Sequence, residues 1–440
     1  MLPAMIGAAS VHKSFMKLAD CADLDPEDHT MQKPNDAEII VIGGGAVGAA
    51  VAYSLALAGR TDVLVVEKEP TLAAMTTAQA AGLVGQVRST VARVALARSS
   101  VETFAKLQEE GDAKPSWRQV GSLRVALTEA RVEEFQRLRR VADEAGLEVD
   151  LIDRAAAEAR WPMMDFGSAQ AVLWCPSDGY LQPSDLTMAS VAASRKRGVR
   201  FATSTQATKV LVDGGQVTGV ATDRGDIECQ TVINAAGPHA YHVARSVGLK
   251  LPIVPVRHEY FVTVRTEGLE PTLPVIRLPD LGLYLRGEVG ALLVGGWEPN
   301  ALSVDPRQFA LGDDPPPITE DWNVLAEFGN LLTPCLPCVG QLGIRSVFRG
   351  WPTFTPDGRF IVGESCRVRG FVMAGGCNAH GVSGSAGLGQ HVVESILEEE
   401  PSPYVKSLSP DRFTEAEWDW SEARRAAQRV YETYYSIDPE

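Results

Sequence analysis

The stretch 38–67 constrains the fold of this chain more than any other part of the sequence. It opens with EIIVI at 38–42, a short apolar run rich in β-branched side chains that is typical of a strand buried on both faces. GGGAVG at 43–48 follows directly and fits the pattern G-x-G-x-x-G, and a small-residue apolar segment typical of a helix packed on a sheet comes next. A second buried strand then ends on Glu67. This order predicts a βαβ unit that binds a dinucleotide.

Each residue of this pattern has a physical role. Gly43 allows the tight turn, Gly45 lets a pyrophosphate approach the backbone, and Gly48 lets the helix touch the strand. The pyrophosphate is expected at the helix N-terminus, where free N–H groups and the helix dipole favour an anion. Glu67 can accept hydrogen bonds from the two ribose hydroxyls of an adenosine, and it would repel a 2′-phosphate.

A transmembrane helix is the alternative interpretation of this region. Residues 39–59 contain no charged side chain and are long enough to cross a bilayer. Four glycines near the start of the segment would interrupt such a helix, and acidic residues flank it. The dinucleotide interpretation is therefore preferred, and no integral membrane segment is expected.

Length and charge narrow the classes of protein further. A chain of 440 residues predicts two or three domains with an ample core. The formal net charge of −15 argues against a nucleic-acid partner, which would require a basic face. The first 37 residues carry three lysines, no arginine and six acids, which fits neither a transit peptide nor a secretory signal. We expect them to form a loosely ordered extension.

The seven cysteines, an odd number scattered over a long chain, do not resemble a secreted disulfide framework. We therefore expect a reducing, cytoplasmic compartment. Cys335 and Cys338 have C-x-x-C spacing, but no second ligand pair for zinc lies nearby and the motif follows a predicted helix. We interpret them as two buried or partly exposed thiols and predict no metal site.

The loop after Glu67 makes the family resemblance specific. It contains Thr-Thr-x-x-Ala-Ala-Gly-Leu at 76–83, and with the glycine pattern and Glu67 it resembles the D-amino-acid-oxidase superfamily of flavoproteins. Within that superfamily the chain is most similar to the dimethylglycine and sarcosine dehydrogenases and oxidases. The resemblance extends to NAAG at 234–237, TPDG at 355–358 and a glycine-rich loop at 375–387. It implies that the dinucleotide is FAD, and that the last loop contacts the flavin ring.

The residues expected to contact FAD come from these motifs. They are Gly43, Gly45, Ala46, Val47, Gly48, Glu67, Lys68, Thr76, Thr77, Gln79, Ala80, Gly82, Leu83, Val210, Ala235, Ala236, Gly237, Gly350, Gly376, Asn378, His380, Gly381 and Val382.

The expected fold class is α/β, a two-domain flavoprotein in which a Rossmann-like FAD-binding domain carries an inserted antiparallel-sheet substrate domain. Hairpin signals at the DG and RG turns near 213 and 224 and β-rich segments after 251 support the two sheet types. The expected domains are an N-terminal extension at 1–37, a discontinuous FAD-binding domain at 38–110, 171–250 and 341–400, a substrate domain at 111–170 and 251–340, and a C-terminal tail helix within 401–440. The sequence indicates no role for this tail.

Candidate substrate residues lie on two predicted strands and in two loops. The run PVRHEY at 255–260 resembles the HQY strand of the dimethylglycine enzymes, and alternation places its histidine and tyrosine on one face. Tyr284 and Arg286 share a face of the next strand in the same way, and Arg88 falls where the sarcosine oxidases carry a substrate-side arginine. The candidates are Tyr260, His258, His380, Arg88, Tyr284 and Arg286, with Trp297 and Arg349 as wall residues. Ser383 stands where the sarcosine oxidases carry a carboxylate-binding lysine, which weakens a simple transfer of sarcosine specificity.

The resemblance implies oxidation of a secondary or tertiary N-alkyl amino acid, or a related amine, by hydride transfer to flavin N5, after which the imine hydrolyses. Two alternatives stay open: a D-amino-acid or opine dehydrogenase or oxidase on the same fold, and a flavin-binding subunit without turnover. The electron acceptor (oxygen, a quinone or an electron-transfer protein) and the oligomeric state are also open.

We expect FAD to be held without a covalent bond. The dimethylglycine and sarcosine dehydrogenases attach it to a histidine where this chain has Gln79, and the monomeric sarcosine oxidases attach it to a cysteine where this chain has Gly350. The remaining nearby thiol is Cys377, in the glycine-rich loop.

Overall fold

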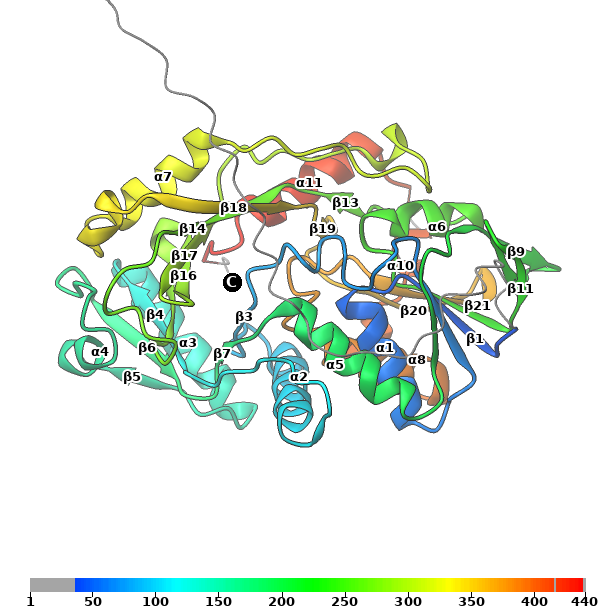
Figure 1. Cartoon of the computed structure of the whole chain (residues 1–440), viewed down its shortest axis with the longest axis horizontal. Helices are drawn as coiled ribbons and strands as arrows, with labels where there is room; N and C mark the ends of the chain where they lie inside the picture. Colours follow the sequence, from blue (N-terminus) through cyan, green and yellow to red (C-terminus); the bar gives the residue numbers. More distant parts are fainter. Residues whose placement is uncertain (1–35, 415–416, 438–440) are drawn as a thin grey trace, which may run out of the picture. The chain divides into compact units, whose positions relative to one another are not determined.

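A computed structural model describes residues 36–414 and 417–437 of the chain (Figure 1). Nearly all of the predicted N-terminal extension therefore lies outside the described residues. The predicted βαβ unit is present. It consists of β1 (Ile39–Ile42), α1 (Ala46–Leu57) and β2 (Val63–Val66), with β1 and β2 parallel. A strand and a glycine turn thus occupy the start of the segment considered as a transmembrane helix, and none of the helices in the described ranges has the length and apolar character needed to cross a bilayer.

A nine-stranded sheet surrounds this unit, with the order β11-β10-β21-β12-β1-β2-β8. Outside this order, β20 pairs with β21 and β9 pairs with β10. Neighbouring strands from β21 through β12, β1 and β2 to β8 are parallel, as expected of a Rossmann-like core. The further strands of this sheet are β8 (Arg200–Ala202), β9 (Ala207–Asp213), β10 (Gln216–Thr222), β11 (Gly225–Glu228), β12 (Thr231–Asn234), β20 (Ile361–Ser365) and β21 (Val368–Gly375).

Both faces of the parallel core are covered, which explains why β1 is apolar throughout. Ile39 and Val41 pack with α1 and α8, whereas Ile40 and Ile42 pack with α6 on the opposite face. Figure 1 shows α1, α5 and α8 side by side along one part of this sheet, and α1 contacts both of the others. The helices of this half are α2 (Val91–Glu110), α5 (Pro183–Arg195), α6 (Ala240–Ser246) and α8 (Ser385–Leu397).

The second large sheet has eight strands in the order β18-β14-β17-β16-β15-β4-β6-β5. Its pairs are antiparallel except β15 with β4. Its strands are β4 (Ser122–Ala126), β5 (Asp150–Ile152), β6 (Ala171–Cys175), β14 (His258–Thr263), β15 (Val275–Leu278), β16 (Leu283–Glu288), β17 (Ala291–Gly296) and β18 (Ile344–Gly350). Three helices contact strands of this sheet: α3 (Glu129–Glu144), α4 (Arg154–Arg160) and α7 (Trp322–Leu332).

Two segments of this sheet differ from the sequence expectation. β6 and β18 fall inside the ranges 171–250 and 341–400, yet they pair with β4 and β14 rather than with the parallel core. Neither was recognised as a strand. β6 is a short apolar run whose periodicity cannot separate strand from helix, and β18 is only partly buried, so its pattern is weak.

The described residues also form two small two-stranded sheets. One pairs β3 (Leu83–Val84) with β7 (Gly179–Tyr180), and the other pairs β13 (Val254–Pro255) with β19 (Thr353–Phe354). Cys335 is buried and Cys338 partly buried just after α7, so the interpretation of this pair as two thiols is confirmed.

The described residues of the C-terminal tail form three helices rather than the single helix expected within 401–440. They are α9 (Pro403–Ser407), α10 (Asp411–Thr414) and α11 (Trp420–Glu432). The helix α11 buries Trp420, Ala423, Ala427 and Tyr431, which are spaced as one helical face. It packs on β13 and β19, which pair with each other.

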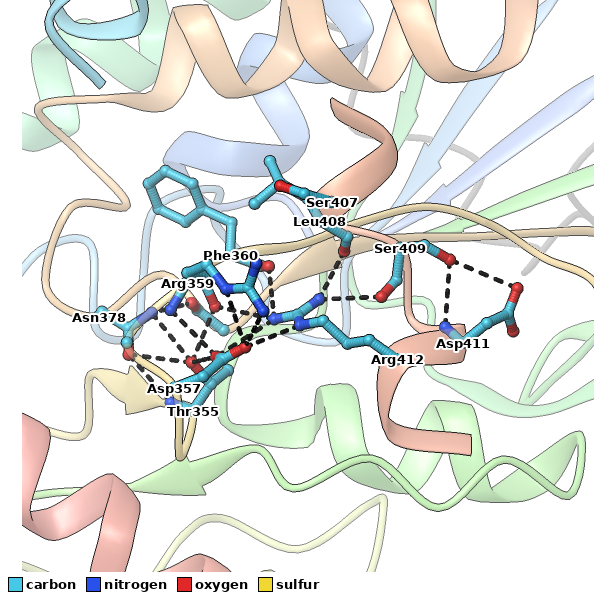
Figure 2. Close-up of polar contacts among 12 residues, drawn as sticks. Thr355, Asp357, Arg359, Phe360, Asn378, Ser407, Leu408, Ser409, Asp411 and Arg412 are labelled. Carbon is cyan, nitrogen blue, oxygen red and sulfur yellow. Dashed lines mark hydrogen bonds and ion pairs between the residues drawn. The ribbon is translucent and has the colours of Figure 1, made fainter. Parts of the chain in front are cut away.

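The tail also fixes the TPDG turn. Figure 2 shows the Arg412 guanidinium directed at Asp357, with Nε 2.9 Å from Oδ2, while its NH2 donates to the Phe360 carbonyl at 2.8 Å. On the other side of the turn, the Thr355 amide donates to Asn378 Oδ1 at 2.9 Å. These contacts tie the glycine-rich loop to the tail through one turn.

Candidate functional site

A long pocket extends from the end of β1 to the eight-stranded sheet. Most residues predicted to contact the cofactor line it. They are Gly43, Gly45, Ala46, Val47, Glu67, Lys68, Thr76, Thr77, Gln79, Ala80, Gly82, Leu83, Ala235, Ala236, Gly237, Gly350, His380, Gly381 and Val382. The candidates Arg88, His258, Tyr284 and Trp297 line the same pocket.

The glycine turn at one end has no room for side chains. Gly43 has φ +111°, and a Cβ there would lie 2.5 Å from the Ala235 carbonyl oxygen. A Cβ on Gly48 would lie 1.9 Å from the Gly43 carbonyl oxygen, so helix α1 touches the end of β1 at this residue. A Cβ on Gly45 would enter the space before Thr77, 3.0 Å from its hydroxyl oxygen. The turn is thus a narrow backbone cradle at a helix N-terminus, which fits a pyrophosphate.

Glu67 lies beside this cradle. Its Oε2 accepts from the Gly44 amide at 2.7 Å and its Oε1 accepts from the Glu69 amide at 2.9 Å. Each carboxylate oxygen keeps a second lone pair, so the side chain can still accept a hydrogen bond from a ribose hydroxyl. Lys68, the next residue, pairs with Asp314 at 2.7 Å and so holds the segment after β17 against the pocket.

His239 was not recognised from the sequence as a site residue. It lines the pocket at 6% exposure, and neither of its ring nitrogens has a hydrogen-bond partner in the described part of the chain. Burial lowers its pKa to about 4, so the ring is neutral at physiological pH. A buried polar ring without a partner fits a pocket that holds a ligand rich in hydrogen-bonding groups, as FAD is.

The other end of the pocket is aromatic. His258 on β14 and Tyr284 on β16 contact each other, with Nε2 2.6 Å from the tyrosine oxygen. Trp297, just after β17, stacks on His258 with ring centroids 4.7 Å apart. Burial lowers the pKa of His258 to about 4, so this histidine is also neutral.

The C-terminal tail closes this end, which the sequence did not indicate. The Tyr434 ring stacks on Trp297 with centroids 3.8 Å apart and lines the pocket. Its hydroxyl lies 3.0 Å from His380 Nε2, while His380 Nδ1 lies 2.8 Å from the Asn378 carbonyl oxygen. Burial, followed by the charge of Arg88, lowers the pKa of His380 well below its usual value. His380 is therefore a neutral ring between the glycine-rich loop and the tail.

Two arginines supply the positive charge at this end. Arg88 was predicted, whereas Arg277 on β15 was not, because a single arginine in a short apolar strand gives no sequence signal. Burial lowers the pKa of Arg88 to about 10, so it stays cationic at neutral pH. Arg277 NH1 donates to the Tyr435 hydroxyl at 3.0 Å, and its Nε has no partner among the described residues. The nearby carboxylate, Asp178, accepts instead from Gln86 and Ser122. The pair can therefore bind an anion.

Comparison with known proteins decides the family. The family described as "FAD dependent oxidoreductase" (DAO) matches residues 38–395. The chain belongs to this family. The resemblance inferred from the motifs is thereby confirmed, and with it FAD as the cofactor and the Rossmann-like fold.

Two curated relatives and one solved structure illustrate the similarity of this FAD-dependent oxidoreductase. Human mitochondrial sarcosine dehydrogenase is 31% identical over 417 residues, which cover 92% of this chain and 44% of that protein. The 4-methylaminobutanoate oxidase (formaldehyde-forming) of Paenarthrobacter nicotinovorans is 29% identical over 381 residues, which cover 87% of this chain and 46% of that protein. The chain thus spans about half the length of the curated relatives it matches. The crystal structure of L-proline dehydrogenase from P. horikoshii has a TM-score of 0.79 and 26% identity, covering 88% of this chain and all of that one (100%).

Several predicted residues of the oxidoreductase lie next to the pocket rather than on its lining. Tyr260 and Arg286 lie behind the loop at 76–83, where the Tyr260 hydroxyl donates to the Ala80 carbonyl at 3.3 Å and Arg286 Nε donates to the Ala81 carbonyl at 2.9 Å. Both side chains therefore hold the loop in place. Arg349 pairs with Glu320 at 2.8 Å, away from the lining.

Among the predicted cofactor residues, Gly48, Val210, Gly376 and Asn378 are absent from the lining. Val210 lies on β9 and is buried in the core, and the earlier residues 205–207 line the pocket instead. Gly376, with φ +61°, and Asn378, whose Nδ2 donates to the Gly376 carbonyl at 2.6 Å, shape the glycine-rich loop from within.

Gln79 and Gly350, the two positions where the family resemblance would place a covalent flavin attachment, lie against each other in the pocket. A Cβ on Gly350 would lie 2.5 Å from Gln79 Oε1. Neither residue offers a nucleophile, and burial raises the pKa of the Cys377 thiol to about 12, so little thiolate is present there. We expect acid precipitation of the purified protein to release all flavin into the supernatant. A yellow pellet from the wild-type protein would contradict non-covalent binding, whereas Gln79→His is the variant expected to give one.

Proposed function

We propose that this oxidoreductase acts on a secondary or tertiary N-alkyl amino acid or a related amine. The observation that carries the proposal is the combination, in one pocket, of a neutral histidine–tyrosine pair, an aromatic wall and two arginine cations. The names of the relatives, sarcosine dehydrogenase and 4-methylaminobutanoate oxidase, support the same substrate class. FAD, when bound, supplies the hydride acceptor.

The chain's own residues bind and prepare the amine. Arg88 and Arg277 bind the substrate carboxylate through charge-assisted hydrogen bonds. Trp297 and Tyr434 pack on the apolar part of the substrate and exclude water from it. The amine must be neutral to release hydride, and the Tyr284 oxygen accepts its proton as the Tyr284 hydroxyl proton passes to His258 Nε2, 2.6 Å away.

An anaerobic substrate screen tests this function. N-methylglycine, N,N-dimethylglycine and 4-methylaminobutanoate are each mixed with the purified holoenzyme, with proline and D-alanine in parallel. We expect the N-methyl amino acids to bleach the visible absorbance of the flavin fastest. Bleaching by D-alanine alone would favour the D-amino-acid alternative, and bleaching by none of these compounds would contradict the proposal.

A further inference from the structure

A chain of hydrogen bonds leads from the pocket into the C-terminal helix. The Tyr284 oxygen lies 2.6 Å from His258 Nε2, and the other ring nitrogen, Nδ1, lies 3.0 Å from the Tyr431 oxygen. The Tyr431 hydroxyl in turn donates to Glu298 Oε2. Tyr431 and Glu298 do not line the pocket, so they would not contact a substrate.

The donor and acceptor of every hydrogen bond in this row are fixed by its last acceptor, Glu298. Glu298 is a carboxylate that also accepts from Arg257 at 3.3 Å, so Tyr431 must donate its proton to it. The Tyr431 oxygen can then only accept from His258, which places the proton of the neutral ring on Nδ1. Nε2 is left as an acceptor, and the Tyr284 hydroxyl donates to it. The lone pairs of the Tyr284 oxygen thus face the pocket.

Beyond Glu298, the polar contacts reach a less buried region. Arg257 also contacts Asp321 at 3.1 Å, and the side chain of Asp321 is 34% exposed. Burial raises the pKa of Glu298 above its usual value, and burial raises the pKa of the neighbouring Glu259 to about 7. A buried carboxyl group whose pKa is raised takes up a proton more readily than an exposed one.

We propose that Tyr431 and Glu298 form the outer half of a proton relay that carries the amine proton from the Tyr284–His258 pair to the buried Glu298 carboxylate. The inference rests on the proposed function. One proton leaves the substrate ammonium for the Tyr284 oxygen while the Tyr284 proton passes to His258 Nε2. The proton on His258 Nδ1 passes to Tyr431, and the Tyr431 proton passes to Glu298. The substrate becomes a neutral amine and Glu298 a neutral acid, so charge and protons balance.

Packing alone does not account for the Tyr431 hydroxyl. The ring lies among Val254, Val256 and Phe354, all fully buried, where phenylalanine would pack equally well. A buried hydroxyl on a buried carboxylate costs desolvation at both groups. Tyr431 and Glu298 therefore act as positioning residues that fix the histidine tautomer and receive the proton.

The tautomer of His258 is the first readout, and it requires no turnover. In the ¹⁵N-histidine spectrum of the holoenzyme, assigned by the signal lost in His258→Asn, we expect a neutral ring with the proton on Nδ1. In Glu298→Gln the amide oxygen faces Arg257 and the NH₂ group donates to Tyr431. The Tyr431 hydroxyl then turns to His258, and the proton moves to Nε2. An unchanged Nδ1–H tautomer in Glu298→Gln would overturn the assigned direction.

The rate of anaerobic flavin reduction is the second readout. We expect Glu298→Gln and Tyr431→Phe to lower its limiting rate by about tenfold or more, with amine binding nearly unchanged and with partial recovery in Glu298→Asp. Tyr241→Phe is the matched control. Tyr241 is buried against Trp420 of α11, the helix that carries Tyr431, but it is not part of the relay. If an amine reduces the wild-type flavin and both variants match its rate, the relay is wrong and the proposed function stands. If no amine reduces the wild-type flavin, the proposed function itself fails.

Discussion

Replacing Gly45 by valine is expected to give a folded protein that purifies without FAD. A Cβ at this position would lie 3.0 Å from the Thr77 hydroxyl oxygen, and the two γ-methyl groups of valine would fill the space where the pyrophosphate meets the backbone. The Gly45 backbone is extended, with φ −80°, so valine can adopt it without strain. We therefore expect the substitution to prevent FAD binding without preventing folding. The measurement is the ratio of flavin to protein absorbance, alongside a thermal unfolding curve of the apoprotein.

Gly329→Val is the matched control for this change. Gly329 lies in α7, outside the pocket, and a Cβ there meets no atom within 4 Å. We expect this variant to keep its full complement of FAD at a small cost in helix stability. A Gly45→Val protein that binds as much FAD as Gly329→Val would show that the pyrophosphate does not lie at this turn.

The cofactor end was predictable from sequence because its parts are local. The strand, glycine turn, helix and terminal acid lie within 38–67, and each position carries a steric or electrostatic requirement that few residues satisfy. Gly43 and Gly48 show this directly, since a Cβ at either position would collide with backbone. The loop at 76–83 follows immediately and lines the same pocket.

The substrate end of the pocket was predicted only in part. Alternation along a strand shows which side chains share a face of the sheet, but it does not show which other segment covers that face. His258 and Tyr260 share a face of β14, and Tyr284 and Arg286 share a face of β16. His258 and Tyr284 line the pocket, whereas the side chains of Tyr260 and Arg286 donate to carbonyls of the loop at 76–83. The loop at 76–83 is far from β14 and β16 in the sequence. The pattern within each strand therefore could not show which residue of each pair the loop covers.

The role of the tail, though not its helix, escaped prediction for the same reason. Tyr434 meets Trp297 and His380, and Tyr435 meets Arg277, across large separations in sequence. The sequence of the tail shows an amphipathic helix but gives no partner for it. Only the packing of α11 on β13 and β19 brings the last tyrosines to the pocket.

Replacing Arg277 by methionine is expected to weaken amino-acid binding by about 10- to 100-fold, because a hydrogen bond between charged groups contributes about 1.5–3 kcal/mol. Arg88→Met is expected to have a similar effect. Binding of the matching amide, which lacks the carboxylate, should change little in either variant. The measurement is the concentration of each compound that gives half-maximal flavin reduction. Arg277→Lys should recover part of the affinity, since it restores the charge without the planar fork of the guanidinium.

Tyr435→Phe separates the charge of Arg277 from its contact with the tail. Arg277 NH1 donates to the Tyr435 hydroxyl at 3.0 Å, so a loss in Arg277→Met could reflect a displaced tail instead of a missing carboxylate partner. If the tail contact were the cause, Tyr435→Phe would weaken the amino acid and its amide equally, and so would Arg277→Met. We expect instead that Tyr435→Phe changes both affinities little, while Arg277→Met discriminates between the two compounds. Equal losses for the acid and the amide in Arg277→Met would remove this arginine from the binding site.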